Sequence, residues 1–487
     1  MFKSSLSNFR LISHNLSIAI LLYSLVAAQP LCLPAVCEPE ATRITFSQLP
    51  QKLQDWLSRQ GTTQKTFPAY LDSLSLQTSR RELEGEFDHL IFFALQSSRF
   101  TKLLKIEPAR SAYELVQSLD ENERASFFLK RQNADNRLVA KIPDGVRLRL
   151  QDFINILTQN NSDERLKYFK KFITANSSHK NSLLLKLSQE YLRSMSFLYE
   201  KEFGSSEDNT PQKIASHVSS LYQERGHSTD TQIEANFAIH QALASIKALE
   251  PERKIQNVLI IGPGQDFAPR TDFIDTFEPQ SYQPFAVADA LLRFKFSDMD
   301  SLRIHCVDIN ARVIDYLQSS SGKPITLSII SGLADRSERP LSEEFKQYFQ
   351  SLGQQIGVES KLNSHFFSNH LQKTLQIKSE ATSRITSGRL NIISHRYAPS
   401  PNYDLVIITN VFPYFNQIEL SLAITNIAAM MKENGYLLHN EDRPELQSFA
   451  LLNGIPATQS RTALIAGQQH KALFDGVVIH QKIASKK

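Results

Sequence analysis

The sequence predicts a mostly α-helical N-terminal domain followed by an α/β domain built on a doubly wound sheet. Apolar residues recur at three- and four-residue spacing through residues 44–225, whereas strands alternate with helices from residue 255 onward. The chain has 487 residues, of which 41% are apolar and 21% are charged, so it is long enough for two or three globular domains. We place the helical domain at residues 44–225 and the α/β domain at residues 226–487.

The first 28 residues are typical of a targeting segment. Lys3 and Arg10 come before an apolar run from residue 16 to residue 28, which ends in the small residues VAA. This order indicates a cleaved signal peptide, which would make the protein periplasmic or secreted. An uncleaved anchor, an organelle transit peptide and an over-called start of a cytoplasmic protein are the alternatives. No other 18-residue stretch is apolar, so we expect no integral membrane domain beyond this segment.

Charge and cysteine content argue against two classes of partner. The net charge is +4 at pH 7 and no stripe of lysine and arginine stands out, so we expect no nucleic-acid binding. Cys32, Cys37 and Cys306 lack the spacing of a metal site, so we expect no metal. Cys32 and Cys37 could form a bridge in an oxidising compartment or remain two unpaired thiols.

The helical region carries apolar stripes but no chemical motif that we recognise. We expect these stripes to form helix cores, and we assign no binding role to residues 44–225. One stripe along a long predicted helix consists of Leu184, Leu187, Tyr191 and Met195.

The C-terminal region alternates predicted strands and helices. Residues 402–410 contain a continuous apolar run, as a strand buried on both faces of a parallel sheet requires. Asn416 and Glu419 predict the start of a helix, and Gly435 predicts its end. The predicted strands are 254–262, 302–310, 389–395, 402–410, 435–441 and 476–483, and the predicted helices are 283–294, 311–318 and 416–432.

Two motifs follow the first two of these strands, at the edge where such sheets bind ligands. Gly262 and Gly264, in VLIIGPGQDF, allow a left-handed turn and the close approach of a ligand, although a structural tight turn has the same composition. Asp308 could accept hydrogen bonds from both hydroxyls of a ribose, or cap the following helix. It lies 46 residues after Gly262, against about 20 in the dinucleotide-binding fingerprint, because a long loop intervenes.

Two further motifs follow later strands. NVFPYF, residues 410–415, offers the amide of Asn410, a turn fixed by Pro413 and the hydroxyl of Tyr414. HNEDRPE, residues 439–445, offers His439 and Glu441, the one plausible acid–base pair at this edge. Ordinary turn chemistry and a solvated polar loop are the respective alternatives.

In this order the motifs resemble those of class I S-adenosylmethionine-dependent methyltransferases. The segment from residue 403 to residue 438 is especially similar to the chemotaxis-receptor methyltransferase branch. The resemblance covers residues 250–487 and leaves out the helical half. It implies a Rossmann-like fold with a mixed seven-stranded sheet, and S-adenosyl-L-methionine as the cofactor.

The resemblance also implies roles for six residues, with two departures from the family pattern. The family usually has an acid where Ile260 stands and a third glycine where Asp266 stands. We expect Asp266 either to face the ammonium group of the cofactor or to cap a turn. The implied cofactor-binding residues are Gly262, Gly264, Asp308 and Asn410, and those of the acceptor pocket are Pro413 and Tyr414.

We therefore expect methyl transfer from S-adenosylmethionine to an unknown acceptor, which is a small molecule or a protein. No residue is assigned to catalysis, and the candidates are Tyr414, His439 and Glu441. Because of the two departures, a non-catalytic extracytoplasmic interaction protein on a methyltransferase-like scaffold is the alternative. An NAD-dependent enzyme is disfavoured because Phe267 occupies the last glycine position of GxGxxG.

Overall fold

A computed structural model describes residues 40–129, 136–159, 161–176, 180–204, 219–267, 273–276, 278–360, 369–399, 402–467 and 472–484. Residues Ala41–Lys487 form one compact unit. The predicted targeting segment 1–28, with Cys32 and Cys37, lies outside the described residues. Within them, no helix is both long and apolar enough to cross a membrane.

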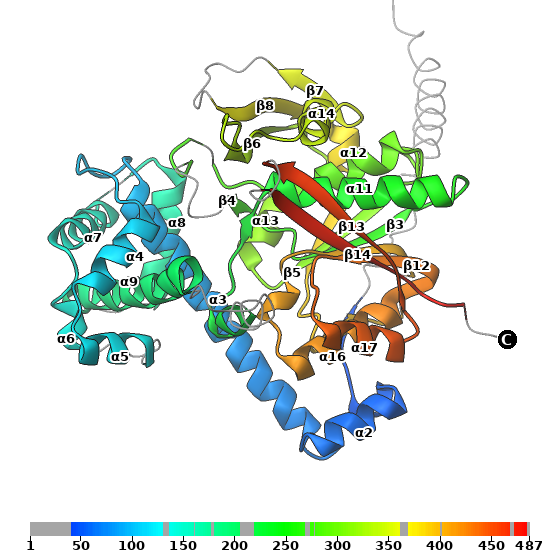
Figure 1. Ribbon diagram of the computed structural model, residues 1–487, viewed down its shortest axis with the longest axis horizontal. Helices are drawn as coiled ribbons and strands as arrows, with labels where there is room; N and C mark the ends of the chain where they lie inside the picture. Colours follow the sequence, from blue (N-terminus) through cyan, green and yellow to red (C-terminus); the bar gives the residue numbers. More distant parts are fainter. Residues whose placement is uncertain are drawn as a thin grey trace, which may run out of the picture. The chain divides into compact units, whose positions relative to one another are not determined.

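A mixed seven-stranded sheet forms the centre of the C-terminal half, as predicted (Figure 1). Its order is β13-β14-β12-β11-β3-β5-β9, and β14 runs antiparallel to both β12 and β13 while the other neighbours are parallel. Successive parallel strands are added on one side of β3 and then on the other, which makes the edge beside β3 the switch point where doubly wound sheets bind ligands. The strands are β3 (Asn257–Ile261), β5 (Arg303–Asp308), β9 (Ile385–Arg389), β11 (Tyr403–Ile408), β12 (Met431–His439), β13 (Ala457–Ala466) and β14 (Leu473–Gln481).

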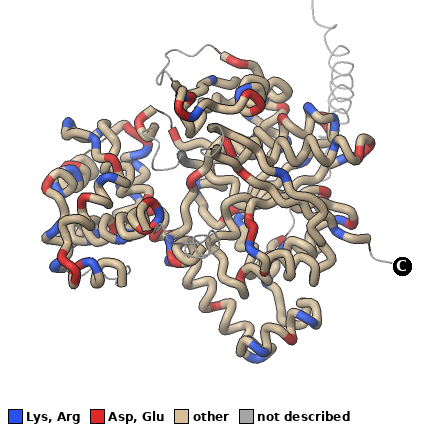
Figure 2. The backbone as a smooth tube through the Cα atoms, in the orientation of Figure 1, with Lys and Arg blue, Asp and Glu red and all other residues tan. Residues whose placement is uncertain are grey.

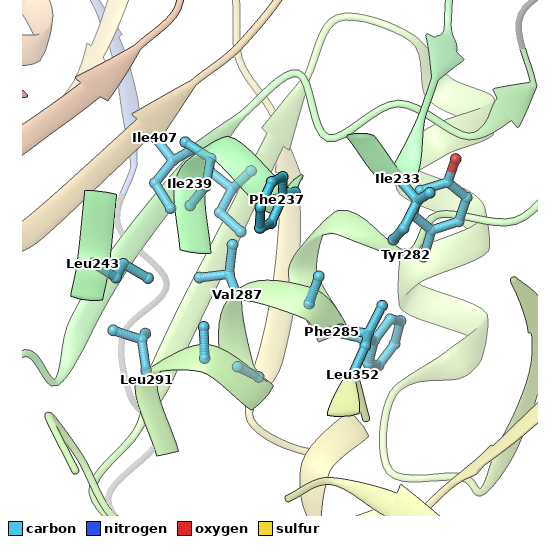
Figure 3. Packing of buried hydrophobic residues seen from close by; sticks show 14 of the residues in the cluster. Ile233, Phe237, Ile239, Leu243, Tyr282, Phe285, Val287, Leu291, Leu352 and Ile407 are labelled. Atoms are coloured by element: carbon cyan, nitrogen blue, oxygen red, sulfur yellow. The ribbon is translucent and has the colours of Figure 1, made fainter. Parts of the chain in front are cut away.

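One face of this sheet is covered by α11 (Ile233–Leu249), α12 (Gln283–Arg293) and α13 (Ala311–Ser320). Figure 3 shows Phe237 and Leu243 of α11 and Val287 of α12 packed near Ile407 of β11. These side chains are at most 1% exposed, so they form a dry core between helices and sheet.

The opposite face is covered by C-terminal and N-terminal elements together. α16 (Gln417–Met430) and α17 (Pro444–Leu452) pack there, as do η1 (Phe46–Gln48), α2 (Gln51–Arg59) and the start of α3 (Phe67–Gln96). In addition, β1 (Ala41–Arg43) pairs with β10 (His395–Tyr397). Buried Phe46, Leu53 and Leu71 share this core with Leu259 of β3 and Leu420 of α16. The N-terminal helices of the described residues therefore complete the sheet's own core.

The second half of α3 enters a separate helical group (Figure 1). Leu187, Tyr191 and Met195 on α9 are fully buried in it, as their spacing predicts, whereas Leu184 of the same stripe is only partly buried. Acidic and basic residues are interspersed along these helices (Figure 2). Its other helices are α4 (Pro108–Gln117), α5 (Glu121–Leu129), α6 (Asn136–Val139), α7 (Asp144–Leu157), α8 (Glu164–Asn176) and α9 (Lys180–Phe203).

A small antiparallel sheet is inserted between α13 and β9, and the sequence analysis did not anticipate it. Its order is β6-β8-β7, formed by β6 (Ile325–Ala334), β7 (Gly357–Ser360) and β8 (His370–Ile377). The remaining elements are α14 (Glu343–Ser351), α15 (Ser379–Thr382), η2 (Phe412–Tyr414) and the parallel pair β2 (Asp230–Thr231) with β4 (Asp266–Phe267).

Two predicted element boundaries were wrong. Residues 389–395 are not one strand, because β9 ends at Arg389, β10 begins at His395, and the turn between them contains the buried Ile392 and Ile393. The Asn426 side chain donates hydrogen bonds to both isoleucine carbonyls, so the turn needs no strand partner. Helix α16 ends at Met430 rather than 432, and Gly435 lies inside β12.

Candidate functional site

The loops that follow β3, β5 and β11 line one pocket at the carboxyl edge of the sheet. Its empty volume is ≈ 960 Å³ with the open mouth included, a size that suits a drug-sized ligand. Of the residues that the sequence analysis assigned to the cofactor, Gly262, Gly264, Asp308 and Asn410 all line it. We call it the first pocket.

Both glycines of the turn adopt a backbone conformation that other residues rarely take. The φ angle is 68° at Gly262 and 71° at Gly264. A Cβ on Gly262 would lie 2.5 Å from the Val411 side chain, and one on Gly264 would lie 3.0 Å from the Thr229 carbonyl oxygen. The glycines therefore let neighbouring protein segments, rather than a ligand alone, approach the turn closely.

Asp308 ends β5 with its carboxylate at the pocket. Its Oδ1 accepts a hydrogen bond of 2.8 Å from the Asn310 backbone N–H. The cap of α13 is Asn310 itself, whose side chain accepts from the Arg312 N–H, so Asp308 does not cap that helix. Burial in the first place, together with the charge of Glu82, raises the pKa of Asp308 to about 7. The carboxyl therefore titrates near neutral pH.

Asn410 joins the loops after β11 and β12. Its backbone N–H donates to Asn440 Oδ1 at 2.8 Å, and the Asn440 side chain donates back to Asn410 Oδ1 at 2.7 Å. The φ angle of Asn410 is 58°, in the left-handed region that asparagine tolerates better than most residues. This pair holds Asn410 at the rim of the first pocket.

Gln283, at the start of α12, brings an unused acceptor to the first pocket. Its Nε2 donates to the Thr409 hydroxyl at 2.9 Å, and both residues line the pocket. Its Oε1 is buried and has no hydrogen-bond partner within the described part of the chain. Because buried polar atoms are normally paired, this oxygen suits a donor group on a bound ligand.

The helical N-terminal half closes the pocket, which the sequence did not indicate. Thr78 and Glu82 of α3 line it. Arg81 of α3 donates to the backbone carbonyls of Tyr222, Arg225 and Tyr414 at 2.8–2.9 Å.

A glycine inside α3 makes this close packing possible. A Cβ on Gly85 would lie 1.8 Å from the His227 carbonyl oxygen, so only glycine fits here. An isolated glycine in a predicted helix was the one available sequence signal for this approach.

His227 also lines the first pocket, and the sequence analysis missed it. Both of its ring nitrogens are buried without a hydrogen-bond partner among the described residues. Burial and the nearby charge of Arg81 hold the pKa of His227 well below its usual value. The imidazole is therefore neutral at physiological pH, with one nitrogen available as donor and the other as acceptor.

Tyr414 stands between the first pocket and a neighbouring one, which we call the second pocket. The second pocket has an empty volume of ≈ 1410 Å³, open solvent included, and is also lined by Pro413. Ser228, Asp230, Asn410 and Tyr414 line both pockets. Burial raises the pKa of Tyr414 to about 12, so its hydroxyl keeps its proton at neutral pH.

His439 lies in a buried network instead of facing a pocket. It is 0% exposed, and its Nε2 lies 2.8 Å from Nε2 of His480. Its Nδ1 accepts the Glu441 backbone N–H at 3.1 Å, while His480 Nδ1 donates to the Ile455 carbonyl at 2.7 Å. With both nitrogens engaged, His439 has no free position for proton transfer.

Glu441 lines the second pocket, but its carboxylate is taken by Arg443 at 3.1 Å. This geometry argues against the acid–base pair that we expected of His439 and Glu441. The backbone of Asp266 pairs with Asp230 in β4 and β2. The structure does not describe the Asp266 side chain, so its role toward the ammonium group stays a prediction.

Comparison with known proteins gives a family match inside the C-terminal half. Residues 323–449 match the family described as "CheR methyltransferase, SAM binding domain". The matched range is about a quarter of the chain; it includes β11, η2, α16 and β12, and begins after the glycine turn and Asp308. No curated protein matches the chain.

Two solved structures are similar to parts of the chain at low identity. The N-methyltransferase NodS from Bradyrhizobium japonicum WM9 is 11% identical, covers 50% of this chain and 95% of its own, and has a TM-score of 0.25. The magnesium protoporphyrin IX methyltransferase ChlM from Synechocystis PCC 6803, with bound SAM, is 10% identical, covers 63% and 99% respectively, and has a TM-score of 0.26.

The first pocket fits S-adenosylmethionine on two observations. The Asp308 carboxylate can accept hydrogen bonds from ribose hydroxyls, and the orphan Gln283 Oε1 can accept one from an amine. The pocket lies at the switch point of the sheet, where the fold binds nucleotides. The C-terminal half of this chain therefore contains a region, residues 323–449, that matches the CheR methyltransferase SAM-binding domain, and S-adenosylmethionine is the cofactor that this family description names.

Proposed function

We propose that this domain transfers the methyl group of S-adenosylmethionine to an acceptor held in the second pocket. Gly262, Gly264, Asp308 and Asn410 hold the cofactor in the first pocket. The observation that carries the proposal is that the two pockets adjoin and share a wall, which includes Asn410 and Tyr414. A methyl group that moves from the cofactor in the first pocket to an acceptor in the second would pass these residues.

The cofactor supplies a methyl group bonded to a positively charged sulfur. Transfer of this methyl group to a lone pair of the acceptor would leave S-adenosylhomocysteine behind, and the protein would mainly have to align the two molecules in a pocket that excludes water. Asp308 orients the ribose, and Gln283 accepts a hydrogen bond from the cofactor amine. The protonated Tyr414 hydroxyl serves as a hydrogen-bond donor at the shared wall, and we assign no general base.

Calorimetry with S-adenosylhomocysteine tests the cofactor assignment. We expect Asp308→Ala to weaken binding at least about tenfold, because the charge-assisted hydrogen bonds to the ribose are lost. Asp315→Ala is the matched control, since Asp315 is exposed on α13, close to the same loop. Equal affinity of both variants and the wild type would remove Asp308 from the cofactor site.

Transfer itself is tested with methyl-labelled S-adenosylmethionine and a cell extract that is separated into protein and small-molecule fractions. Label should enter one fraction with the wild type and not with Asp308→Ala. If neither fraction gains label although S-adenosylhomocysteine binds, the domain has kept the cofactor and lost transfer.

We also propose that residues 1–28 direct the chain out of the cytoplasm. Support comes from the order of basic residues, apolar run and small residues in the sequence. Cell fractionation combined with N-terminal sequencing tests this proposal, which predicts a mature N-terminus near residue 29. A cytoplasmic protein that keeps residue 1 would contradict it.

A further inference from the structure

The second pocket contains a buried cation that donates no hydrogen bond to any residue the structure describes. This cation is the guanidinium of Arg225, whose side chain is 6% exposed. Its Nε is buried and has no hydrogen-bond partner among the described residues. A guanidinium carries five N–H donors, and leaving buried donors without acceptors costs free energy. Water or a ligand must supply the missing acceptors.

The two carboxylates nearest to Arg225 do not satisfy it. Asp88 lies 3.8 Å from its Nε and Asp230 lies 3.6 Å from its Nη2, beyond the usual 2.7–3.2 Å of such hydrogen bonds. Oδ1 of Asp88 accepts hydrogen bonds from Arg193 at 2.7 Å and from the hydroxyl of Ser194, and these contacts hold its Oδ2 at 3.8 Å from Arg225. These carboxylates balance part of the charge but leave the donors of Arg225 available.

Aromatic rings support the cations on this wall of the pocket. Arg225 lies over the Phe197 ring at 4.5 Å, and the Lys201 ammonium lies 5.3 Å from the centre of the Tyr222 ring. Tyr222 in turn contacts Tyr414 edge to face at 5.5 Å. The wall therefore leads from two cations of the helical half to the tyrosine at the boundary with the cofactor pocket.

The opposite wall offers less to a ligand. Glu441 is paired with Arg443 at 3.1 Å, and Asn440 is bonded to Asn410. Asp442 is exposed at the rim. The strongest unmet hydrogen-bonding capacity in the pocket is thus cationic, and it favours a planar or tetrahedral oxyanion, which a guanidinium binds through two parallel hydrogen bonds.

We infer that the second pocket binds the methyl acceptor through an anionic group, a carboxylate or a phosphate, on Arg225. That the bound molecule accepts a methyl group rests on the proposed function. That the pocket binds an anion does not. It assigns substrate recognition to the helical half, because Arg225, Lys201 and Phe197 all precede the methyltransferase domain in the chain.

Three probes that share a phenyl ring test the inference: the anions benzoate and phenyl phosphate, and the neutral benzamide. Each is titrated by calorimetry into the full chain, with and without S-adenosylhomocysteine. We expect one of the two anions to bind at least tenfold more tightly than benzamide. The anion that binds more tightly shows whether the pocket prefers a carboxylate or a phosphate. Arg225→Met should remove that preference. Arg110→Met is the matched control, because the Arg110 side chain is 78% exposed on α4.

The outcomes separate this inference from the proposed function. Anions that bind Arg225→Met as tightly as the wild type, or no tighter than benzamide, overturn the anion site even if S-adenosylhomocysteine binds normally. An anion site that depends on Arg225 in a chain that ignores S-adenosylhomocysteine supports the site and refutes the methyl transfer. If circular dichroism finds Arg225→Met unfolded, Arg225→Lys and Lys201→Met provide the same comparison. Arg225→Lys should weaken anion binding because lysine cannot make two parallel hydrogen bonds.

Discussion

We predict that cofactor binding depends on pH through the titration of Asp308, which we propose holds the ribose. Its pKa of about 7 means that the carboxyl is mostly ionised at pH 8 and mostly protonated at pH 6. Only the carboxylate can accept hydrogen bonds from both ribose hydroxyls. The ionised fraction falls from roughly nine-tenths to one-tenth between these pH values, so the apparent Kd for S-adenosylhomocysteine should rise about tenfold.

The assay is calorimetry at pH 6, 7 and 8 on the wild type, on Asp308→Asn and on the control Asp315→Asn. Asp308→Asn should bind weakly at every pH with a flat profile, whereas the control should follow the wild type. The reasoning would be refuted if the Kd of the wild type and that of Asp308→Asn changed equally with pH. Any pH dependence would then come from a group other than Asp308.

The stability of the unliganded protein gives a second readout with its own sign. The folded pKa of Asp308 lies above the ordinary value of about 4, so the folded state holds this proton more tightly than the unfolded state. This contribution to stability is therefore present below pH 4 and is lost as the pH rises to 7. In Asp308→Asn the contribution is absent, so the difference in Tm between variant and wild type should shift in favour of the variant over that range.

Three other predictions follow from the packing around the site. Gly85→Ala should lower the free energy of unfolding by about 1–3 kcal/mol in chemical denaturation, because its Cβ would force α3 away from the His227 carbonyl. The same shift should weaken S-adenosylhomocysteine binding. Unchanged stability would contradict the 1.8 Å contact. Gly264→Ala should cost roughly 1–3 kcal/mol through strain at a φ of 71°, and a normal Tm would mean that the turn relaxes easily. His439→Leu should lower the free energy of unfolding by about 1–3 kcal/mol, because Nε2 of His480 loses its hydrogen bond, yet it should leave the Kd for S-adenosylhomocysteine unchanged. A loss of binding without a loss of stability would restore His439 to the site.

The order of strands and helices could be predicted from the sequence because each element has a local signal. The apolar run of β11 and the capping box of α16, formed by Asn416 and Glu419, both appear where predicted. The turn at Ile392 and Ile393 was misread because its apolar side chains are buried in the core on that face of the sheet, while Asn426, rather than a strand partner, donates hydrogen bonds to its carbonyls. The inserted sheet of β6, β7 and β8 carried no signal that we used.

The predicted part of the candidate site was the part that lies on strand ends. Gly262, Asp308 and Asn410 follow strands that are neighbours in the sheet, so topology brings them together. Glu82 and Arg225 could not be found in this way, because α3 and the segment near Arg225 reach the pockets through long-range packing. His439 looked catalytic by composition, but only the fold reveals the His480 partner that engages it.

The shared core beneath the sheet decides where this protein can be divided. A fragment that starts at residue 226 would lose Phe46, Leu53 and Leu71, and would leave Leu259 and Leu420 facing water. It would also lose Arg81, whose three carbonyl contacts tie the segment at Tyr222 and Arg225 to the loop at Tyr414. We therefore expect that the C-terminal half does not fold by itself, and that any recombination with a foreign N-terminal region has to keep the chain from residue 41 through α3.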